Sequence, residues 1–278
     1  MTKSALWSVY LATLMPFSAQ AAEWEIEVGG FFSRTDTKLN AYDPYLDKIR
    51  SIDFESDLDL KEVALLPYLD LEYYFNDKHS VYFDWRSLHR EATRTAVTKP
   101  FEFTSGGVAY VVQAGSKLIT ELDIDIARIG YGYQFYTNEK WSLDVLAGLH
   151  VMWLSLGFDG KFGVKVGDEV EIPTLLIDEK VINEVTAPLP DLGIRVEYAL
   201  SEEWLLRSHA QLFYLSIEDI EGYLAEVDIG AKYFITDQFS ATGSFNYYEV
   251  GVDYDSSRSD IDVTFRFYGP MLTLAYKF

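Results

Sequence analysis

The chain has 278 residues, no cysteine and a formal net charge of −21. The lack of cysteine excludes disulfides and thiol chemistry, and the acidity makes nucleic acid a poor partner, because phosphate binding requires positive charge. Aromatic residues make up 16% of the chain, and no run of about 20 apolar residues occurs, which excludes a helical membrane protein.

The N-terminal segment has the three parts of a secretory signal peptide. Lys3 supplies the positive charge, residues 5–17 form a short apolar run, and Ala19-Gln20-Ala21 is a small-residue cleavage site. We therefore predict a cleaved signal peptide over residues 1–21 and a mature chain over residues 22–278.

Short polar turns, each flanked by aromatic residues, recur at 76–79, 137–140, 201–203 and 236–238. The segments between them are longer, and their centres are acidic and irregular. This pattern predicts hairpins with tight turns at one end and long loops at the other. Ten strands result, with eight or twelve as alternatives. They cover residues 23–36, 62–76, 79–95, 117–136, 140–157, 188–200, 203–217, 221–235, 238–254 and 261–278.

Two of the loops carry strand-like patterns of their own. In the first loop, 37–61, the alternation of Ser51 to Leu60 can extend a strand. The longest loop, 157–190, can form a protruding hairpin or fold inward as a constriction.

Alternation along the strands separates an apolar face from a charged one. Within 140–157, Trp141, Val145 and Leu149 share one face, whereas Asp144 and His150 share the other. Apolar residues outside and charges of both signs inside predict a single antiparallel up-and-down transmembrane β-barrel over 22–278. The alternation changes phase near Ile126 and near Tyr268, so we expect β-bulges at both places.

The inward face carries acids and bases at neighbouring depths. The acids are Glu25, Glu27, Asp70, Glu72, Asp84, Asp144, Glu197, Glu226 and Asp228, and the bases are Arg86, Arg128, Arg195, Arg207 and Lys232. Buried charges must pair, because an unpaired one costs several kcal/mol. We therefore predict an ion-pair network that closes the lumen, and a narrow polar pore is the alternative. Its expected members are Asp84, Arg86, Arg128, Asp144, Arg195, Glu197, Arg207, Glu226, Asp228 and Lys232.

The last strand ends in an alternating pattern that finishes on Tyr276-Lys277-Phe278. With the signal peptide, the hairpin turns and the alternation, this ending resembles the small outer-membrane β-barrels of Gram-negative bacteria, of the OmpX, OmpW and omptin size class. The resemblance implies an outer-membrane location. It also implies that Tyr276 and Phe278 form the signal read by the barrel assembly machinery, and that lipid and lipopolysaccharide surround the wall.

The histidines give little support for catalysis. His79 lies in a turn, His89 is expected to face outward, and His150 lies in mid-wall. Ser208 and His209 are adjacent and so point to opposite faces, a poor arrangement for a nucleophile and its base. We predict no catalytic residue and no cofactor.

Two rows of acids could approach each other above the membrane. Asp53, Glu55, Asp57 and Asp59 alternate along one segment, and Glu121, Asp123 and Asp125 form the second row. Carboxylates of this kind can hold Ca²⁺, but a solvated acidic rim is the preferred interpretation, so we assign no metal site and keep divalent cations only as partners of the acidic loops.

These observations favour a non-enzymatic outer-membrane barrel with a charge-plugged lumen, acidic extracellular loops and a structural or surface role. The alternatives are a narrow channel for small solutes and an enzyme at the outer rim that modifies lipids or peptides.

Overall fold

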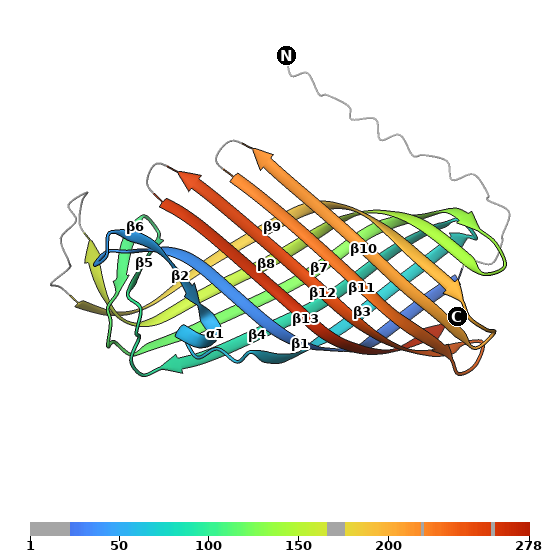
Figure 1. Cartoon of the computed structure of the whole chain (residues 1–278), viewed down its shortest axis with the longest axis horizontal. Helices are drawn as coiled ribbons and strands as arrows, with labels where there is room; N and C mark the ends of the chain where they lie inside the picture. Colours follow the sequence, from blue (N-terminus) through green and yellow to red (C-terminus); the bar gives the residue numbers. More distant parts are fainter. Residues whose placement is uncertain (1–22, 166–175, 218–219, 257–258) are drawn as a thin grey trace, which may run out of the picture.

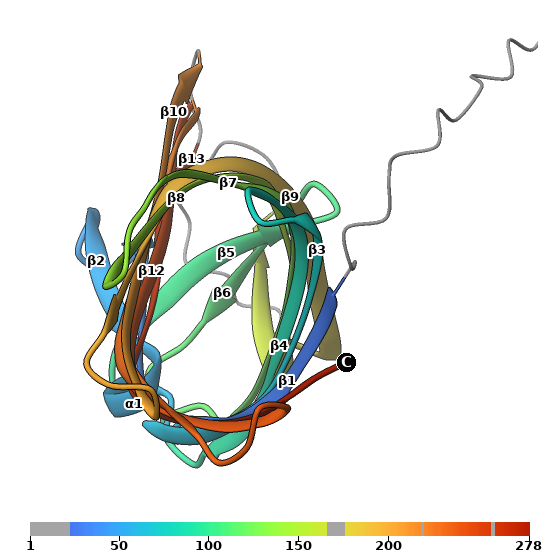
Figure 2. The ribbon, with the colours of Figure 1, turned by 90° about the vertical axis from the view of Figure 1, so that its right-hand side faces the viewer.

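The computed structural model describes residues 23–165, 176–217, 220–256 and 259–278, and the signal peptide prediction lies outside them. Within these residues, ten antiparallel strands form a closed barrel (Figures 1 and 2). The strands are β1 (Glu23–Asp43), β3 (Val63–Asn76), β4 (His79–Arg94), β7 (Leu118–Thr137), β8 (Trp141–Lys165), β9 (Leu176–Ala199), β10 (Trp204–Ile217), β11 (Ile220–Phe234), β12 (Phe239–Ser256) and β13 (Ser259–Lys277). The predicted ten-stranded barrel is confirmed.

Each strand of the barrel pairs with the next in chain order, and the β1–β13 pair closes the ring. At this seam, Trp24 and Phe278 exchange both backbone hydrogen bonds, at 3.0 and 2.9 Å. The Tyr276 ring stacks on that of Phe278 and also contacts Phe239. The C-terminus and the start of β1 therefore lie at the same end of the barrel, which we call the turn end.

The tight turns at the turn end are where the sequence places them. Backbone hydrogen bonds close them, such as Asn138 N–H to Trp141 O at 2.9 Å and Ile235 N–H to Phe239 O at 2.8 Å. The Asn138 side chain also accepts from the Lys140 and Trp141 N–H groups, a local bond typical of turn asparagines. In outer-membrane barrels the short turns face the periplasm.

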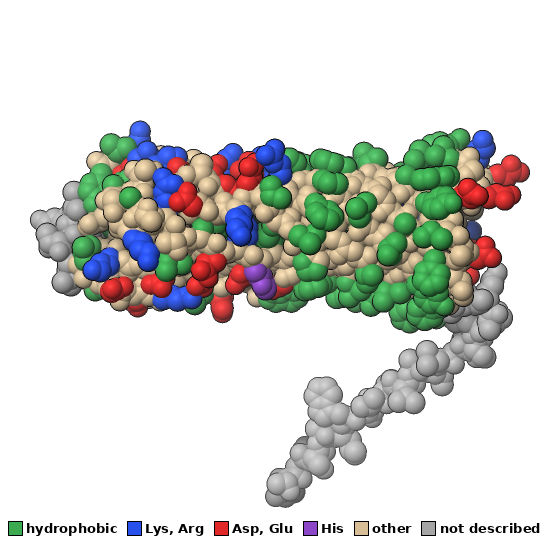
Figure 3. Space-filling view, turned by 90° about the horizontal axis from the view of Figure 1, so that it is seen from below, with side chains coloured by type: hydrophobic (Ala, Val, Ile, Leu, Met, Phe, Trp, Pro, Cys, Tyr) green, Lys and Arg blue, Asp and Glu red, His purple; other side chains and the backbone are tan. Residues whose placement is uncertain are grey.

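The outer surface changes character along the barrel axis. On the face that Figure 3 shows, apolar side chains cover the half nearer the turn end, and most of the charged side chains lie over the other half, the loop end. Exposed apolar residues such as Val145, Ile229 and Leu274 belong to this belt. The belt is the surface that lipid covers, and the strands continue well beyond it.

Strand β7 shows how this change is made without any break in the strand. At its loop end Leu122 and Ile124 are buried inside while Asp123 and Asp125 face out, and beyond Ile126 the buried residue is Arg128. The pairings with β4 and β8 run in unbroken register through this region. The apolar residues therefore change from the inner face to the outer face at this point, whereas the alternation of the strand continues without a shift.

The expected bulges near Ile126 and Tyr268 are therefore wrong. Around Tyr268, the β12–β13 register is continuous, and the β1–β13 register resumes unshifted at Arg34 after a short interruption beside Pro270. The apparent change of phase arose because we took apolar residues to face outward along the whole strand. At the loop end, apolar residues face inward.

The loop end contains structure that the sequence did not predict. A hairpin of β5 (Phe101–Ser105) and β6 (Val108–Val112) pairs with β8 through β6. In the first loop, β2 (Lys48–Asp53) pairs with β1, and one helical turn, α1 (Phe54–Asp57), follows it. The expected strand from Ser51 to Leu60 thus ends at Asp53. In the longest loop, β8 and β9 extend the wall as a paired hairpin, which agrees with the first of our two alternatives.

These additions fill the barrel at the loop end with an apolar core. Phe54, Phe101, Phe158 and Phe162 are fully buried there. The Phe158 ring contacts those of Phe54 and Phe101, and Phe103 connects Phe158 to Phe162. Among the described residues, no helix is long and apolar enough to span a membrane.

The wall divides at two places above the turn end, and each division begins at a proline. The β3–β4 ladder runs only as far as Tyr68 opposite Arg86, next to Pro67. The β9–β10 ladder stops at Leu192 opposite Leu212, short of Pro190. In antiparallel pairs every second residue of a strand directs its N–H to the same neighbouring strand. By this alternation, Pro67 and Pro190 each occupy the position whose N–H would make the next bond of the ladder, and proline has no N–H.

Candidate functional site: the closed lumen

Glu226 is the centre of the charged lumen. It projects from β11 and accepts hydrogen bonds from Arg86 of β4 at 2.8 Å and from Arg128 of β7 at 3.0 Å. Arg128 also donates to Asp84 at 2.6 Å. Because β11 lies far from β4 and β7 in the strand order, these bonds connect opposite walls and close the lumen at this depth.

The strand register explains how these charges meet. Asp84 and Arg128 are cross-strand partners in the β4–β7 pair, and Arg86 follows Asp84 on the same face after two residues. The Glu226 side chain is completely buried, so two guanidinium groups offset the cost of burying a carboxylate. Asn246 of β12 donates a further hydrogen bond to Glu226 at 3.1 Å.

A polar and aromatic layer separates this centre from the apolar core. The Tyr248 hydroxyl lies 2.8 Å from His150 Nε2, and the Arg86 guanidinium stacks over the Tyr248 ring, 5.5 Å from its centre. Both Tyr248 and His150 are buried. This layer joins the charged part of the lumen to the apolar part.

Tyr82 crosses the same region by way of a notch in the wall. Gly130 and Gly148 are cross-strand partners, and a Cβ on Gly130 would lie only 2.3 Å from the Tyr82 ring. The Tyr82 hydroxyl accepts from Gln211 Nε2 of β10 at 3.0 Å. Glycine at 130 is therefore needed for Tyr82 to reach across the lumen.

Three more ion pairs fill the lumen at the turn end. Arg195 bonds Glu72 at 2.8 Å, Arg207 bonds Glu27 at 3.0 Å, and Lys232 bonds Glu25 at 2.5 Å. The cavity that remains among these side chains is only about 40 Å³, little more than the space of one water molecule.

The structure brings most of the expected network residues into ion pairs, but in a different arrangement. The expected residues that form pairs are Asp84, Arg86, Arg128, Asp144, Arg195, Arg207, Glu226 and Lys232. Arg195 and Arg207 find their main partners on β3 and β1, across the lumen, in Glu72 and Glu27, which were not among the expected members of the network. Glu197 and Asp228 form no ion pair with any described residue, although Asp228 accepts from Ser244 at 2.8 Å.

Two polar residues of the lumen, Asp191 and Gln211, were not predicted from the sequence. Asp191 is buried, and its Oδ1 accepts from Gln211 Nε2 at 3.3 Å. Asp191 has the same parity as Arg195 and Glu197 on β9, so the alternation could have placed it inside. The predicted strand, 188–200, already contained Asp191.

The histidines form no catalytic relay with the described residues. His89 faces outward as expected, and its Nε2 lies 3.3 Å from Ser87 Oγ and 3.4 Å from Asp125 Oδ2. In a Ser–His–Asp triad the acid and the nucleophile bind different ring nitrogens, whereas here both contact Nε2. His209 lies 3.6 Å from Glu226 inside the lumen.

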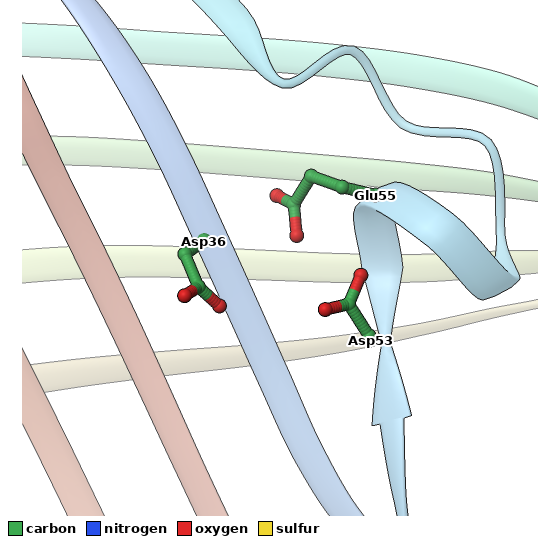
Figure 4. Close-up of side chains that lie close together, drawn as sticks. All are labelled: Asp36, Asp53 and Glu55. Atoms are coloured by element: carbon green, nitrogen blue, oxygen red, sulfur yellow. The ribbon is translucent and has the colours of Figure 1, made fainter.

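The acids of the first predicted row are each held by the protein. Asp57 pairs with Lys99 at 2.6 Å, and Asp59 pairs with Arg94 at 2.5 Å. Asp53, Glu55 and Asp36 do approach one another, as Figure 4 shows, with carboxylate oxygens within 4.8 Å. Each of these three carboxylates already has a protein partner: Glu55 pairs with Arg90, Asp36 pairs with Arg266, and Asp53 accepts from the Ser56 N–H.

A sequence model of the family described as "Protein of unknown function, DUF481" matches residues 122–278, from within β7 to the C-terminus. No curated protein sequence matches the chain.

Solved outer-membrane structures resemble the fold at low sequence identity. The outer membrane protease OmpT of Escherichia coli shares 11% identity with a TM-score of 0.58, over 96% of this chain and 99% of that one. The attachment invasion locus protein Ail of Yersinia pestis (11% identity, TM-score 0.35, 92% and 99% covered) and the toluene transporter TodX of Pseudomonas putida (9%, 0.34, 94% and 91%) are more distant. At such identities the OmpT likeness supports the fold alone, that of an outer-membrane barrel.

Proposed function

Because the chain belongs to the family described as "Protein of unknown function, DUF481", a description that assigns no activity, we propose a function from its geometry. The protein is a closed, non-enzymatic barrel of the Gram-negative outer membrane, and its role is to hold a folded β-structure above the membrane surface.

The proposal rests on one observation: two successive layers fill the lumen, one of ion pairs and one of apolar side chains. Within the apolar belt, Arg86, Arg128 and Glu226 connect opposite walls. Above the belt, the β5–β6 hairpin and α1 pack their aromatic residues into a continuous apolar core. A solute would have to displace both layers, which argues against a resting channel.

The structure above the belt supports a surface role. Strands β8 and β9 extend as a paired hairpin to Gly163 opposite Leu176, and charged residues cover this half on the face seen in Figure 3. A long, rigid, hydrophilic extension is suited to contacts outside the cell.

The channel alternative also has an observation in its favour. Asp70 faces the small cavity at the turn end and forms no ion pair with a described residue, so acids outnumber their basic partners inside. If the lumen opened, this excess would make the pore cation-selective, because field lines from the acids would concentrate cations there.

Conductance measurements separate the two functions. The mature protein is reconstituted into planar bilayers, and a general porin serves as the positive control. We expect no steady conductance from the wild type, because the ion pairs and the apolar core leave no continuous water path. Ohmic, cation-selective channels from the wild type would refute the closed-barrel proposal and favour the pore.

Two further proposals concern partners. Tyr276 and Phe278 face outward at the seam strand, which supports recognition of this strand by the barrel assembly machinery. The outward row Glu121, Asp123 and Asp125 on β7 supports weak binding of divalent cations at the loop end. A rise in unfolding temperature with Ca²⁺ that the row's amide variants lose would support the second.

A further inference from the structure

The division of the wall at Pro67 leaves a cleft between β3 and β4. Residues 63–67 keep their pairing with β1 but have no partner on β4, and residues 87–94 of β4 pair only with β7. A cavity of about 310 Å³ occupies this cleft, at the lower end of the range typical of small-molecule sites. Its lining consists of Lys61, Val63, Ala64, Leu65, Leu88, His89, Arg90 and Glu91.

The cleft lies at the edge of the apolar belt and has two chemically different halves. Val63 and Leu65 are each 61% exposed, and Leu65 is the cross-strand partner of the exposed Phe32. The other half carries the charged side chains of Lys61 and Glu91 and the imidazole of His89. The exposed apolar side chains come from β3 and the polar ones from β4 and Lys61, and a lining with both kinds fits an amphiphile lying at the membrane surface.

Buried Arg90 supplies an independent indication of a ligand. Its terminal nitrogens donate to Glu55 at 2.5 Å, Thr35 at 2.7 Å and Thr37 at 2.6 Å. Its Nε–H is buried, and among the described residues it has no acceptor. Unsatisfied buried donors are rare because each costs about 1–3 kcal/mol, and Arg90 lines the cleft.

The edge of β4 adds more donors to the same place. By the alternation of hydrogen bonds in antiparallel pairs, the N–H groups of Ser87, His89 and Glu91 point toward the missing β3 partner. Pro67, opposite Ser87, lacks the N–H that the next bond of this ladder would need, and the β3–β4 pairing ends there. Backbone N–H groups, a lysine and an arginine form a suitable set of donors for the oxygens of a phosphate.

We propose that the cleft between β3 and β4 binds one lipid of the outer leaflet that carries a terminal phosphate monoester, a group that phosphatidylcholine lacks. Its phosphate oxygens accept from Lys61, from Arg90 Nε–H and from the free edge of β4, and its acyl chain lies along Val63 and Leu65. The apolar half of the cleft favours a membrane lipid over a soluble phosphate, because a soluble phosphate has no acyl chain to cover Val63 and Leu65. The inference is independent of whether the lumen conducts.

Lipid retention tests the proposal. The mature protein is incorporated into phosphatidylcholine vesicles containing a minor fraction of bisphosphorylated lipid A, extracted into mild detergent, and examined by native mass spectrometry. We expect one lipid A to remain bound per wild-type barrel. Lys61→Ala and Leu65→Ser should each lower the retained fraction about tenfold, the effect of one good contact. Pro67→Val, which restores a ladder N–H, should also lower retention by closing the cleft.

Leu212→Ser is the matched control, because Leu212 is 62% exposed in the belt but lies at the other division of the wall. Each variant is first shown to fold by heat-modifiable migration in gels. Equal retention by the wild type and the three cleft variants would overturn the proposal. It would also be overturned by retention of phosphatidylcholine at the level of lipid A, or by full displacement of the lipid by inorganic phosphate.

Discussion

Arg195 forms its ion pair with Glu72, 2.8 Å away across the lumen, and not with Glu197 two residues along its own strand. A strand places residues i and i+2 on the same face but holds them apart, whereas a narrow barrel brings opposite walls within reach of a long side chain. The ion pairs therefore connect the barrel wall to wall.

Arg195→Ala should lower the stability of the barrel substantially. Removing one partner of a buried pair leaves Glu72 uncompensated, a change that costs about 3–5 kcal/mol. Lys277→Ala is the control, because it breaks the exposed pair with Glu23 and should change stability by about 0–1 kcal/mol. Urea unfolding in phospholipid vesicles measures both, and similar losses in the two variants would contradict the wall-to-wall network.

Gly130→Ala should destabilise the barrel through Tyr82. The new Cβ would overlap the Tyr82 ring and displace its hydroxyl from Gln211, and overpacking of this kind costs about 1–3 kcal/mol. In Gly243→Ala the nearest described atom to the new Cβ is Leu272 Cδ2, at 3.6 Å, so this control should stay near wild type. The same urea titration decides, and a Gly130→Ala midpoint at the wild-type value would rule out the notch.

Deletion of Phe278 should prevent assembly. The residue exchanges two backbone hydrogen bonds with Trp24 at the seam and stacks on Tyr276, so its loss shortens the last pairing of the ring. We expect the truncated protein to be degraded or to aggregate before insertion. Phe135→Ala, another exposed aromatic residue near the turn end, should insert normally. Heat-modifiable migration of the truncated protein in outer-membrane fractions is the result that would count against this.

The β1–β2 turn should loosen in acid because of Asp43. Burial alone would raise the pKa of this carboxyl, but hydrogen bonds from Arg50 and from the Tyr45 and Leu46 N–H groups lower it below its usual value. A lowered folded-state pKa stabilises the turn above the unfolded pKa, about 3.9, and this contribution is lost as pH falls through the folded value.

Hydrogen exchange at the amides of Tyr45 and Leu46 measures this effect. Exchange, corrected for the intrinsic pH dependence, should become faster below about pH 4. In Asp43→Ala, which has no side-chain acceptor for the Tyr45 and Leu46 N–H groups, the turn should be loose at every pH. A wild-type turn that stays equally protected on both sides of this range would exclude Asp43 as the cause.

The sequence predicted the barrel because alternation and turn residues act locally. Trp141 and Asp144 point to opposite faces of their strand regardless of the rest of the fold. Asn138 stabilises its turn through hydrogen bonds of its own side chain to nearby N–H groups. The same local argument explains why the strand ends at the turn end are close to those observed, whereas at the loop end β1, β8 and β9 run beyond their predicted limits of 36, 157 and 188 to Asp43, Lys165 and Leu176.

The features that the sequence did not predict depend on distance across the barrel. Whether Arg207 meets Glu27 or Glu226 is set by the diameter and tilt of the wall, which alternation does not contain. The β5–β6 hairpin was missed because Phe101 and Phe103 are explained only by the aromatic core that receives them. The cleft beside Pro67 exists because β3 and β4 do not pair beyond Tyr68 and Arg86, and the alternation of side chains does not reveal where two strands fail to pair.

The unbroken register of β7 has a consequence for the route by which the protein enters the membrane. Asp123 and Asp125 lie outside the barrel above the belt, on the same side of the strand as the lipid-facing Ile129. On a path from the periplasm, the loop end must pass the hydrocarbon first, with this acidic flank foremost. Because charged residues on the lipid side are strongly disfavoured at mid-membrane, these strands must complete their crossing inside a sheltered passage and meet lipid only when the apolar belt arrives.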